Sequence, residues 1–286
     1  MRAEDSKNWI RPLFPYPALF LRKDSERILI VADLHIGWEV TLAEQGIHVP
    51  SQLTKLLMRL KEAISKCRPN RLILLGDVKH TVGKVELAEW RDVPEFFEEV
   101  LGIVPRVDVI PGNHDGDLEP LTPSSVRIYQ PTGISLWGKV GLFHGHAWPG
   151  LDVLACQTLV MAHLHPVVAF RDQFNYRIIK PVWIKASFKP ESMMAVLSKR
   201  RHGENTMAPA EGFEGEHKVI VMPPLNEFLG GQPINEDGSR GKRSGKGERE
   251  LLGPFLRSGC VNMEEAEVYM LDGTYLGSIG QLRAFS

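Results

Sequence analysis

The sequence has few cysteines and no arrangement that would pair them. Only three occur in 286 residues, Cys67, Cys156 and Cys260, and they lie far apart without a C-x-x-C spacing. A disulfide framework needs an even set of cysteines, so three reduced thiols are expected. Reduced thiols favour a reducing compartment, and we expect a cytoplasmic protein.

Long apolar runs and a strong net charge are also absent. No stretch approaches the roughly 18 apolar residues that span a bilayer. The first eleven residues are polar and lack the apolar core of a signal peptide. The formal net charge is -1, so no global basic field indicates nucleic acid, although a local basic patch is not excluded. The composition predicts a globular protein with no membrane association.

The first 120 residues alternate short apolar runs with helical patterns. Strands are predicted at 27–32, 71–75 and 107–110, and helices at 93–101 and at 51–66, the latter with Ser51 as its N-cap. This order predicts parallel strands in an α/β core. Polar residues follow each strand, at the edge where open α/β sheets bind ligands.

Short strands predominate after residue 120. They are predicted near 126–130, 139–143, 158–162, 166–170, 177–186, 192–198 and 218–222, with a hairpin over 266–283 around Asp272-Gly273. A second sheet packed on the first would give a four-layer α/β/β/α sandwich in one domain spanning residues 1–286. Two segments rich in glycine and charge, 199–216 and 235–254, are predicted to be mobile loops.

Seven of the ten histidines fall in short groups with aspartate, asparagine and glycine. The groups are Asp33-Leu-His35, Asp77-Val-Lys-His80, Asn113-His114-Asp115, His144-Gly-His146 and His163-Leu-His165. On an extended chain, residues i and i+2 point the same way, so the D-x-H and H-x-H pairs could each address one centre. Imidazole, carboxylate and amide donors suit Mn, Fe or Zn better than Mg or Ca. Each group alone is commonplace, but all five together predict a metal site.

In this order the groups resemble the calcineurin-like metallophosphoesterase superfamily, whose pattern is D-x-H, G-D, G-N-H-D/E, H and G-H-x-H. The resemblance runs from Asp33 to His165, with Ala162 where the family often has glycine. It implies the α/β/β/α fold and a phosphoester hydrolase with two divalent metal ions. We expect Mn²⁺, although Fe, Zn, Co and Ni accept the same ligands.

The resemblance also implies a role for each matching residue. Asp33, His35 and His165 would hold the first metal ion. Asn113, His144 and His163 would hold the second, and Asp77 would bridge both. His114 would contact the phosphate and help the leaving group depart. Two such ions can clamp a phosphoryl group and lower the pKa of a water between them.

Position 80 separates branches of the superfamily. Phosphoprotein phosphatases carry aspartate where this chain has His80, and G-N-H-E where it has Asp115. That activity is therefore disfavoured. The superfamily's DNA break-resection nucleases carry histidine at this position, which implies a catalytic His80 near the phosphate beside His114. A supporting histidine bonded to the backbone is the alternative.

Two further motifs, residues 33–37 (D-L-H-x-G) and 76–80 (G-D-x-K-H), resemble the ICC-like or DNA-ligase-associated metallophosphoesterases, as does segment 224–231. This resemblance implies a phosphodiesterase or nuclease acting on DNA or RNA, a role in DNA repair, and association with a DNA ligase or helicase. Lys79, His146 and Trp148 are candidate substrate contacts, with loop packing as the alternative. The alternative functions are a phosphodiesterase for cyclic or dinucleotide substrates and a non-catalytic scaffold.

Overall fold

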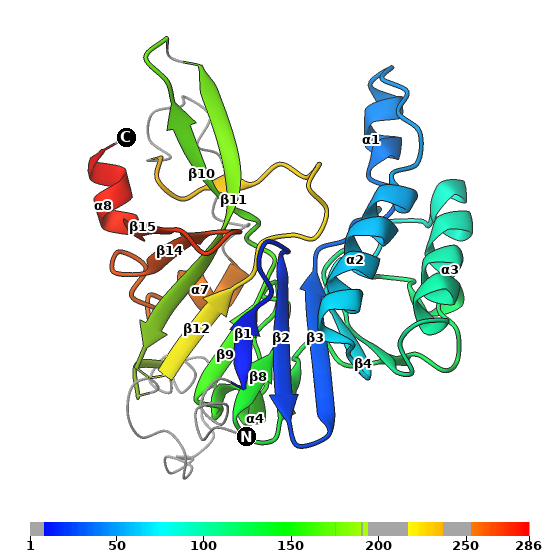
Figure 1. The fold of residues 1–286 in the computed structure, drawn as a ribbon, viewed down its shortest axis with the longest axis horizontal. Coiled ribbons are helices and arrows are strands. Elements are labelled where there is room, and N and C mark those ends of the chain that lie inside the picture. Colours follow the sequence, from blue (N-terminus) through cyan, green and yellow to red (C-terminus); the bar gives the residue numbers. More distant parts are fainter. Residues whose placement is uncertain (1–8, 175, 190, 194–216, 237–252, 286) are drawn as a thin grey trace, which may run out of the picture. The chain divides into compact units, whose positions relative to one another are not determined.

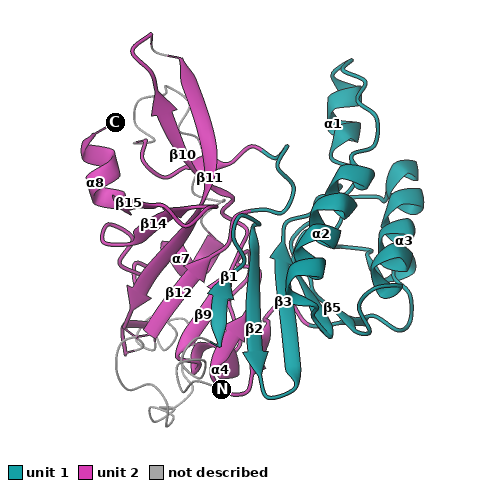
Figure 2. Cartoon of the chain, in the orientation of Figure 1, with its two compact units in different colours: residues 1–129, 224–229 teal, residues 130–223, 230–286 magenta. Residues whose placement is uncertain are grey.

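The chain divides into two compact units (Figures 1 and 2). The computed structural model describes residues 9–174, 176–189, 191–193, 217–236 and 253–285. Unit 1 comprises residues 1–129 and 224–229, and unit 2 comprises 130–223 and 230–286. The predicted mobile loop 199–216 lies outside the described residues, as does nearly all of 235–254. A single domain over 1–286 stays a prediction.

Unit 1 is built on a six-stranded mixed sheet. Its strands, in spatial order, are β1 (Ile10–Pro12), β2 (Ala18–Lys23), β3 (Glu26–Ala32), β4 (Arg71–Leu75), β5 (Val107–Ile110) and β6 (Arg127–Ile128). The four strands from β3 to β6 are parallel, which confirms the predicted arrangement. The loops after β3, β4 and β5 therefore leave the sheet at one edge.

The helices of unit 1 are α1 (Glu39–Glu44), α2 (Leu53–Cys67), α3 (Leu87–Leu101) and the short η1 (Glu119–Leu121). Apolar residues of α2 and α3, such as Leu60 and Phe96, form one core with strand residues such as Leu72. Two predicted boundaries need correction. The N-cap of α2 is Gln52 and not Ser51, whose Oγ donates to Asp92. A capping box starts α3 at residue 87, six residues before the predicted start.

Unit 2 contains a nine-stranded mixed sheet. Seven strands follow the order β13 (Gln232–Pro233), β10 (Pro166–Arg171), β11 (Arg177–Phe188), β12 (His217–Val221), β9 (Thr158–Met161), β8 (Val140–Leu142) and β7 (Ile134–Leu136). The other two, β14 (Glu267–Met270) and β15 (Tyr275–Ser278), join through β11. The short helices are α4 (Leu151–Leu154), α7 (Gly253–Arg257) and α8 (Ile279–Ala284).

Most of the predicted strands of unit 2 are present, and so is the hairpin around Asp272-Gly273. The strand predicted near 192–198 is wrong at its start, because residues 191–193 form a helical turn on the Lys189 carbonyl oxygen. Its remainder lies outside the described residues. The predicted class, a mixed α/β fold with two mixed sheets, is confirmed. Among the described helices, none is long and apolar enough to cross a bilayer.

The three cysteines are free thiols, as predicted. Burial raises the pKa of the Cys67 thiol from its ordinary 9.0 to about 11. Alkylating reagents attack the thiolate, so at pH 8 Cys67 should react about 100-fold more slowly than an ordinary thiol. Iodoacetamide labelling followed by mass spectrometry measures this rate, which should keep rising up to about pH 11. A plateau near pH 9 would contradict the prediction, and the guanidinium-unfolded chain is the control.

Candidate metal centre

In unit 1, the loops that follow β3 and β4 run side by side. The backbone N–H of Asp33 donates to Gly76 (3.2 Å), and that of His35 donates to Asp77 (2.8 Å). These bonds continue the parallel ladder beyond the ends of the strands. As a result, one donor atom each from Asp33, His35 and Asp77 lies within 4.8 Å of the other two. All three side chains are buried.

The predicted ligands have an unusual backbone conformation. Asp33, His35 and Asp77 have φ angles of 52°, 45° and 47°. In unit 2, His163 and His165 have φ angles of 68° and 46°. Left-handed conformations cost a non-glycine residue roughly 1–2 kcal/mol and persist where the surroundings impose them, often at functional sites. This corrects the geometric reason for the D-x-H and H-x-H pairs: the chain is left-handed there and not extended.

The turn after β5 is anchored to the same loop. His114 donates its backbone N–H to Asp77 Oδ1 (2.9 Å). The buried Asp115 carboxylate accepts from Val78 (2.8 Å) and from Gly112 (2.7 Å). Asp115 thus ties the turn to the loop after β4, a role that its place in the G-N-H-D motif did not reveal. Asn113, a predicted metal ligand, lies in this turn with an exposed side chain.

The close approach of this turn to Asp77 requires glycine at position 112. A Cβ atom there would overlap Asp77 Oδ1 and lie 2.5 Å from the Asp77 backbone nitrogen. We expect Gly112→Ala to lower the free energy of unfolding by about 2 kcal/mol or more, because the Asp77 loop must shift. Thermal unfolding measures the effect. Gly116→Ala is the matched control, since its Cβ would make only an ordinary contact at 3.7 Å, and equal stability of both variants would contradict the prediction.

Three histidines of unit 1 form a cluster. His80 Nδ1 lies 3.2 Å from His35 Nδ1, and His80 Nε2 lies 3.0 Å from Thr41 Oγ1. His114 Nδ1 bonds to the backbone carbonyl oxygen of His80, and the two rings stack with centroids 5.6 Å apart. Burial, followed by the neighbouring His114, lowers the pKa of His80, so its imidazole is neutral at neutral pH. His80 therefore lies beside both a predicted ligand and the predicted catalytic histidine.

Glu89 of α3 holds the turn at His80. It was not among the site residues predicted from the sequence. Its Oε1 accepts from the backbone N–H groups of His80 (2.9 Å) and Thr81 (2.7 Å). The Glu89 side chain is fully buried. A Cβ at Gly37 would lie 2.9 Å from Glu89 Cγ, so glycine leaves room for this carboxylate. Glu89 lies four residues before the predicted helix start at residue 93, so no local pattern indicated this role.

A segment distant in sequence, residues 224–229, completes this part of unit 1. The backbone N–H of Leu225 donates to Ala32 (2.8 Å), and Asn226 Nδ2 donates to the Leu34 carbonyl oxygen (2.9 Å). Both bonds hold the loop that carries Asp33 and His35. Residues nearly 200 positions away in the chain therefore support this loop.

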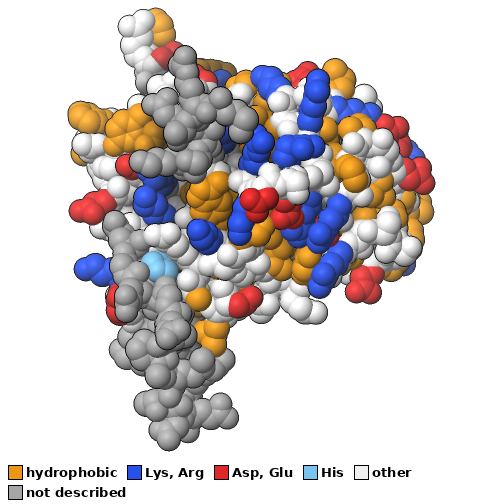
Figure 3. All heavy atoms as spheres, turned by 60° about the horizontal axis from the view of Figure 1, so that its bottom comes forward, with side chains coloured by type: hydrophobic (Ala, Val, Ile, Leu, Met, Phe, Trp, Pro, Cys, Tyr) orange, Lys and Arg blue, Asp and Glu red, His pale blue; other side chains and the backbone are white. Residues whose placement is uncertain are grey.

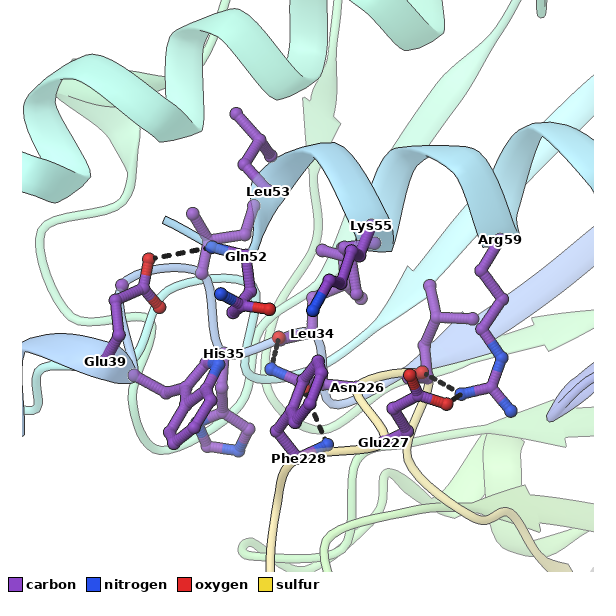
Figure 4. A pocket seen from close by; sticks show the side chains of 15 residues that line it. Leu34, His35, Glu39, Gln52, Leu53, Lys55, Arg59, Asn226, Glu227 and Phe228 are labelled. Atoms are coloured by element: carbon purple, nitrogen blue, oxygen red, sulfur yellow. Dashed lines mark hydrogen bonds and ion pairs between the residues drawn. The ribbon is translucent and has the colours of Figure 1, made fainter. Parts of the chain in front are cut away.

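A pocket adjoins His35 in unit 1 (Figure 4). Lys55 and Arg59 of α2 lie on one side of it, and Phe228 lies on the other. The Phe228 ring stacks on Trp38 with centroids 5.6 Å apart and planes 13° apart. Lys55 Nζ lies 5.0 Å from the centre of the same ring. The pocket beside His35 therefore combines aromatic and cationic side chains.

In unit 2, His144 and His163 follow the parallel neighbours β8 and β9. The Ala162 N–H donates to the His144 carbonyl oxygen (2.9 Å), and the two imidazole rings lie 5.0 Å apart. A donor atom of each lies within 4.8 Å of the other. His165 directly precedes β10 and accepts from the Gln232 N–H (3.0 Å). Parallel pairing therefore brings His144 and His163 together.

The three predicted substrate contacts have different surroundings. Lys79 is fully buried, and its ammonium donates to the Thr81 carbonyl oxygen, which does not favour a role at the rim of a groove. Trp148 is partly buried against the core of unit 2. His146 Nδ1 lies 3.0 Å from His144 Nδ1, so His146 is placed to orient a predicted ligand.

The family model of calcineurin-like phosphoesterases matches residues 26–187, which contain every predicted ligand. The chain belongs to this family. Membership of this family indicates that the protein is a phosphoester hydrolase. A crystal structure of the nuclease MPE from Pseudomonas putida is similar, with 17% identity, a TM-score of 0.52, and coverage of 93% of this chain and 100% of that one.

A second solved structure, of the phosphoesterase Yfce from E. coli, has 22% identity and a TM-score of 0.32, and covers 51% of this chain and 73% of that one. No curated protein matches the chain. The donor set fits the metals that the family normally binds, because carboxylates and an imidazole lie together in unit 1 and the imidazoles of His144 and His163 lie together in unit 2. Such a set suits transition metals better than Mg or Ca.

Proposed function

We propose that this metallophosphoesterase is a phosphodiesterase that cleaves DNA or RNA with two divalent ions, for which Mn²⁺ is the expected metal. The observation that carries the proposal is the convergence of Asp33, His35 and Asp77 in left-handed conformations, with His114 bonded to Asp77. By the family pattern, Asp33, His35 and His165 would hold one ion. Asn113, His144 and His163 would hold the other, and Asp77 would be a ligand of both.

The ions, when bound, would polarise the phosphoryl group and acidify the attacking water. His114 would supply the proton to the leaving oxygen. Its Nδ1 donates to the His80 carbonyl oxygen, which fixes the ring and leaves Nε2 for the substrate. Asp77 Oδ1 holds the His114 backbone in place.

Nucleic acid is favoured as the substrate by the side chains beside the His35 loop. The stacked Trp38 and Phe228, with Lys55 next to them, combine aromatic surface and positive charge. Single-stranded nucleic acids are bound by this combination, through base stacking and phosphate pairing. The similar fold of a bacterial nuclease agrees with this choice. Membership of the ICC-like group, a DNA repair role, and association with a ligase or helicase stay predictions.

The test is cleavage of end-labelled DNA and RNA, single- and double-stranded, by metal-stripped protein with and without Mn²⁺. Cleavage that requires Mn²⁺ and is lost in His114→Ala is the expected result. Hydrolysis of bis(p-nitrophenyl) phosphate without cleavage of any polymer would overturn the nucleic-acid assignment in favour of a small phosphodiester. Failure on every substrate, with bound metal shown by elemental analysis, would favour a non-catalytic scaffold.

A further inference from the structure

One end of the sheet in unit 1 carries a row of basic residues. Arg22 of β2 pairs directly with Arg27 of β3. Arg71 begins β4, and Arg106 directly precedes β5. Arg127 of β6 lies opposite Asp108. Five neighbouring strands therefore present arginine at the same end, and their spacing makes the row about 19 Å long.

Two acidic side chains of this row, Glu26 and Asp108, contact its inner arginines, and a third, Asp24, is exposed in the turn between β2 and β3. Arg71 contacts Asp108 (2.6 Å) and Glu26 (3.1 Å), and Arg106 contacts Asp108 (3.1 Å). The Asp108 carboxylate is buried and therefore interacts with these two arginines instead of with solvent. The five arginines of the row outnumber these three carboxylates, so this end carries an excess of positive charge.

The outer basic residues are exposed to solvent. They are Arg22, Lys23, Arg68 and Arg127. Arg68 is the C-cap of α2 and accepts a hydrogen bond from Arg27 Nε on its carbonyl oxygen, which places it beside β3. Figure 3, turned so that the lower end of Figure 1 comes forward, shows many Lys and Arg side chains on this face, with acidic side chains among them.

The chemistry of the row suits phosphate groups. A guanidinium presents a planar fork of donors that matches phosphate oxygens, and most of the row is arginine. The Arg127 guanidinium also lies 4.4 Å from the centre of the Tyr129 ring, so an aromatic face adjoins the charges. A bilayer surface would instead need apolar side chains that insert beside the charges. The one apolar residue in segments 22–27 and 68–70 is Pro69, which is buried.

We propose that this end of the sheet binds the sugar–phosphate backbone of a nucleic acid, away from the metal centre. The choice of nucleic acid as the polyanion rests on the proposed function, whereas the charge pattern is independent of it. Asp33 follows the seven residues of β3. The row therefore lies about 23 Å from the ligand edge of the same sheet. That distance equals about seven base pairs of duplex. Only a substrate longer than this can contact both the row and the ligand edge, so long substrates should bind more tightly than short ones.

The experiment measures binding of fluorescein-labelled DNA and RNA of about 30 nucleotides by anisotropy, in EDTA so that no cleavage occurs. The test variant combines Arg22→Gln, Lys23→Gln, Arg68→Gln and Arg127→Gln. Its matched control combines Lys139→Gln, Lys180→Gln, Lys189→Gln and Lys218→Gln, four exposed lysines of unit 2 that remove the same net charge. Thermal unfolding checks that both variants are folded.

The test variant should bind at least about 10-fold more weakly near 0.1 M salt, and its slope of log K against log salt should fall by about 3. The control should change affinity by less than about 2-fold. Equal losses in both variants, or no loss in the test variant, would overturn the proposal. Binding to phosphatidylserine vesicles without binding to oligonucleotides would also overturn it, in favour of a membrane surface.

Hydrolysis of bis(p-nitrophenyl) phosphate separates this proposal from the proposed function. The four substituted residues lie at the end of the sheet opposite the predicted ligands, so turnover of this small substrate should stay at the wild-type value. Loss of oligonucleotide binding with unchanged turnover supports a distant binding surface. Normal binding by a protein that cleaves no polymer would count against the proposed function alone.

Discussion

Replacing Asp77 by asparagine is expected to lower phosphodiesterase turnover by about 10³-fold or more while leaving the fold intact. Asparagine keeps an oxygen that can accept the His114 N–H, now 2.9 Å from Asp77 Oδ1. It also tolerates the left-handed backbone at this position, where φ is 47°. The substitution therefore removes mainly the negative charge that two metal ions would share.

The measurement is steady-state turnover of bis(p-nitrophenyl) phosphate across a Mn²⁺ titration, with metal content determined for each protein. Asp117→Asn is the matched control, because Asp117 is an exposed aspartate that also has a positive φ, of 57°. The control should retain wild-type turnover. Full activity in Asp77→Asn would mean that the ligands are assigned wrongly.

Replacing His114 by alanine is expected to lower turnover by about 10²–10⁴-fold for a substrate with an alkoxide leaving group. The His114 ring is held by the His80 carbonyl oxygen at Nδ1, and Nε2 is the nitrogen left to protonate the leaving oxygen. A p-nitrophenolate leaving group needs little protonation. The loss should therefore be much smaller for bis(p-nitrophenyl) phosphate than for an oligonucleotide.

The ratio of the two losses is the decisive quantity, since a merely misfolded site would reduce both rates alike. His48→Ala, at an exposed histidine of unit 1, should change neither rate. Equal losses for both leaving groups in His114→Ala would assign His114 to phosphate binding instead of proton donation. Metal content should be the same in all three proteins.

The local sequence predicted the parallel core and the position of the loops that carry the predicted ligands. Three apolar runs, each followed by polar residues, correspond to β3, β4 and β5. Parallel pairing brings the residues after these strands to one edge of the sheet. The sequence alone therefore placed Asp33 and Asp77 near each other. His144 and His163 were grouped only by the family resemblance, and the parallel pairing of β8 and β9 that brings them together was not predicted. Strand periodicity and short spacing are local properties that a sequence displays directly.

The supporting contacts could not be predicted, because they join residues far apart in the chain. Glu89 bonds to the His80 turn, Asp115 bonds to the loop after β4, and Asn226 bonds to Leu34 across 192 residues. Lys79 resembled an exposed rim residue, yet it is buried. A side chain's burial and partners depend on what packs against it, and no local pattern records that.

The sequence by itself determined the donor chemistry of this phosphoesterase: its carboxylates and imidazoles, and the strands that they follow. Only the tertiary structure decided the conformation that presents them. The D-x-H and H-x-H pairs predicted extended chain, but Asp33, His35, His163 and His165 are left-handed. That conformation is unfavourable for an isolated residue, and the bonds between neighbouring loops impose it. The identity of a residue is a covalent property of the chain, whereas the direction of its side chain results from packing.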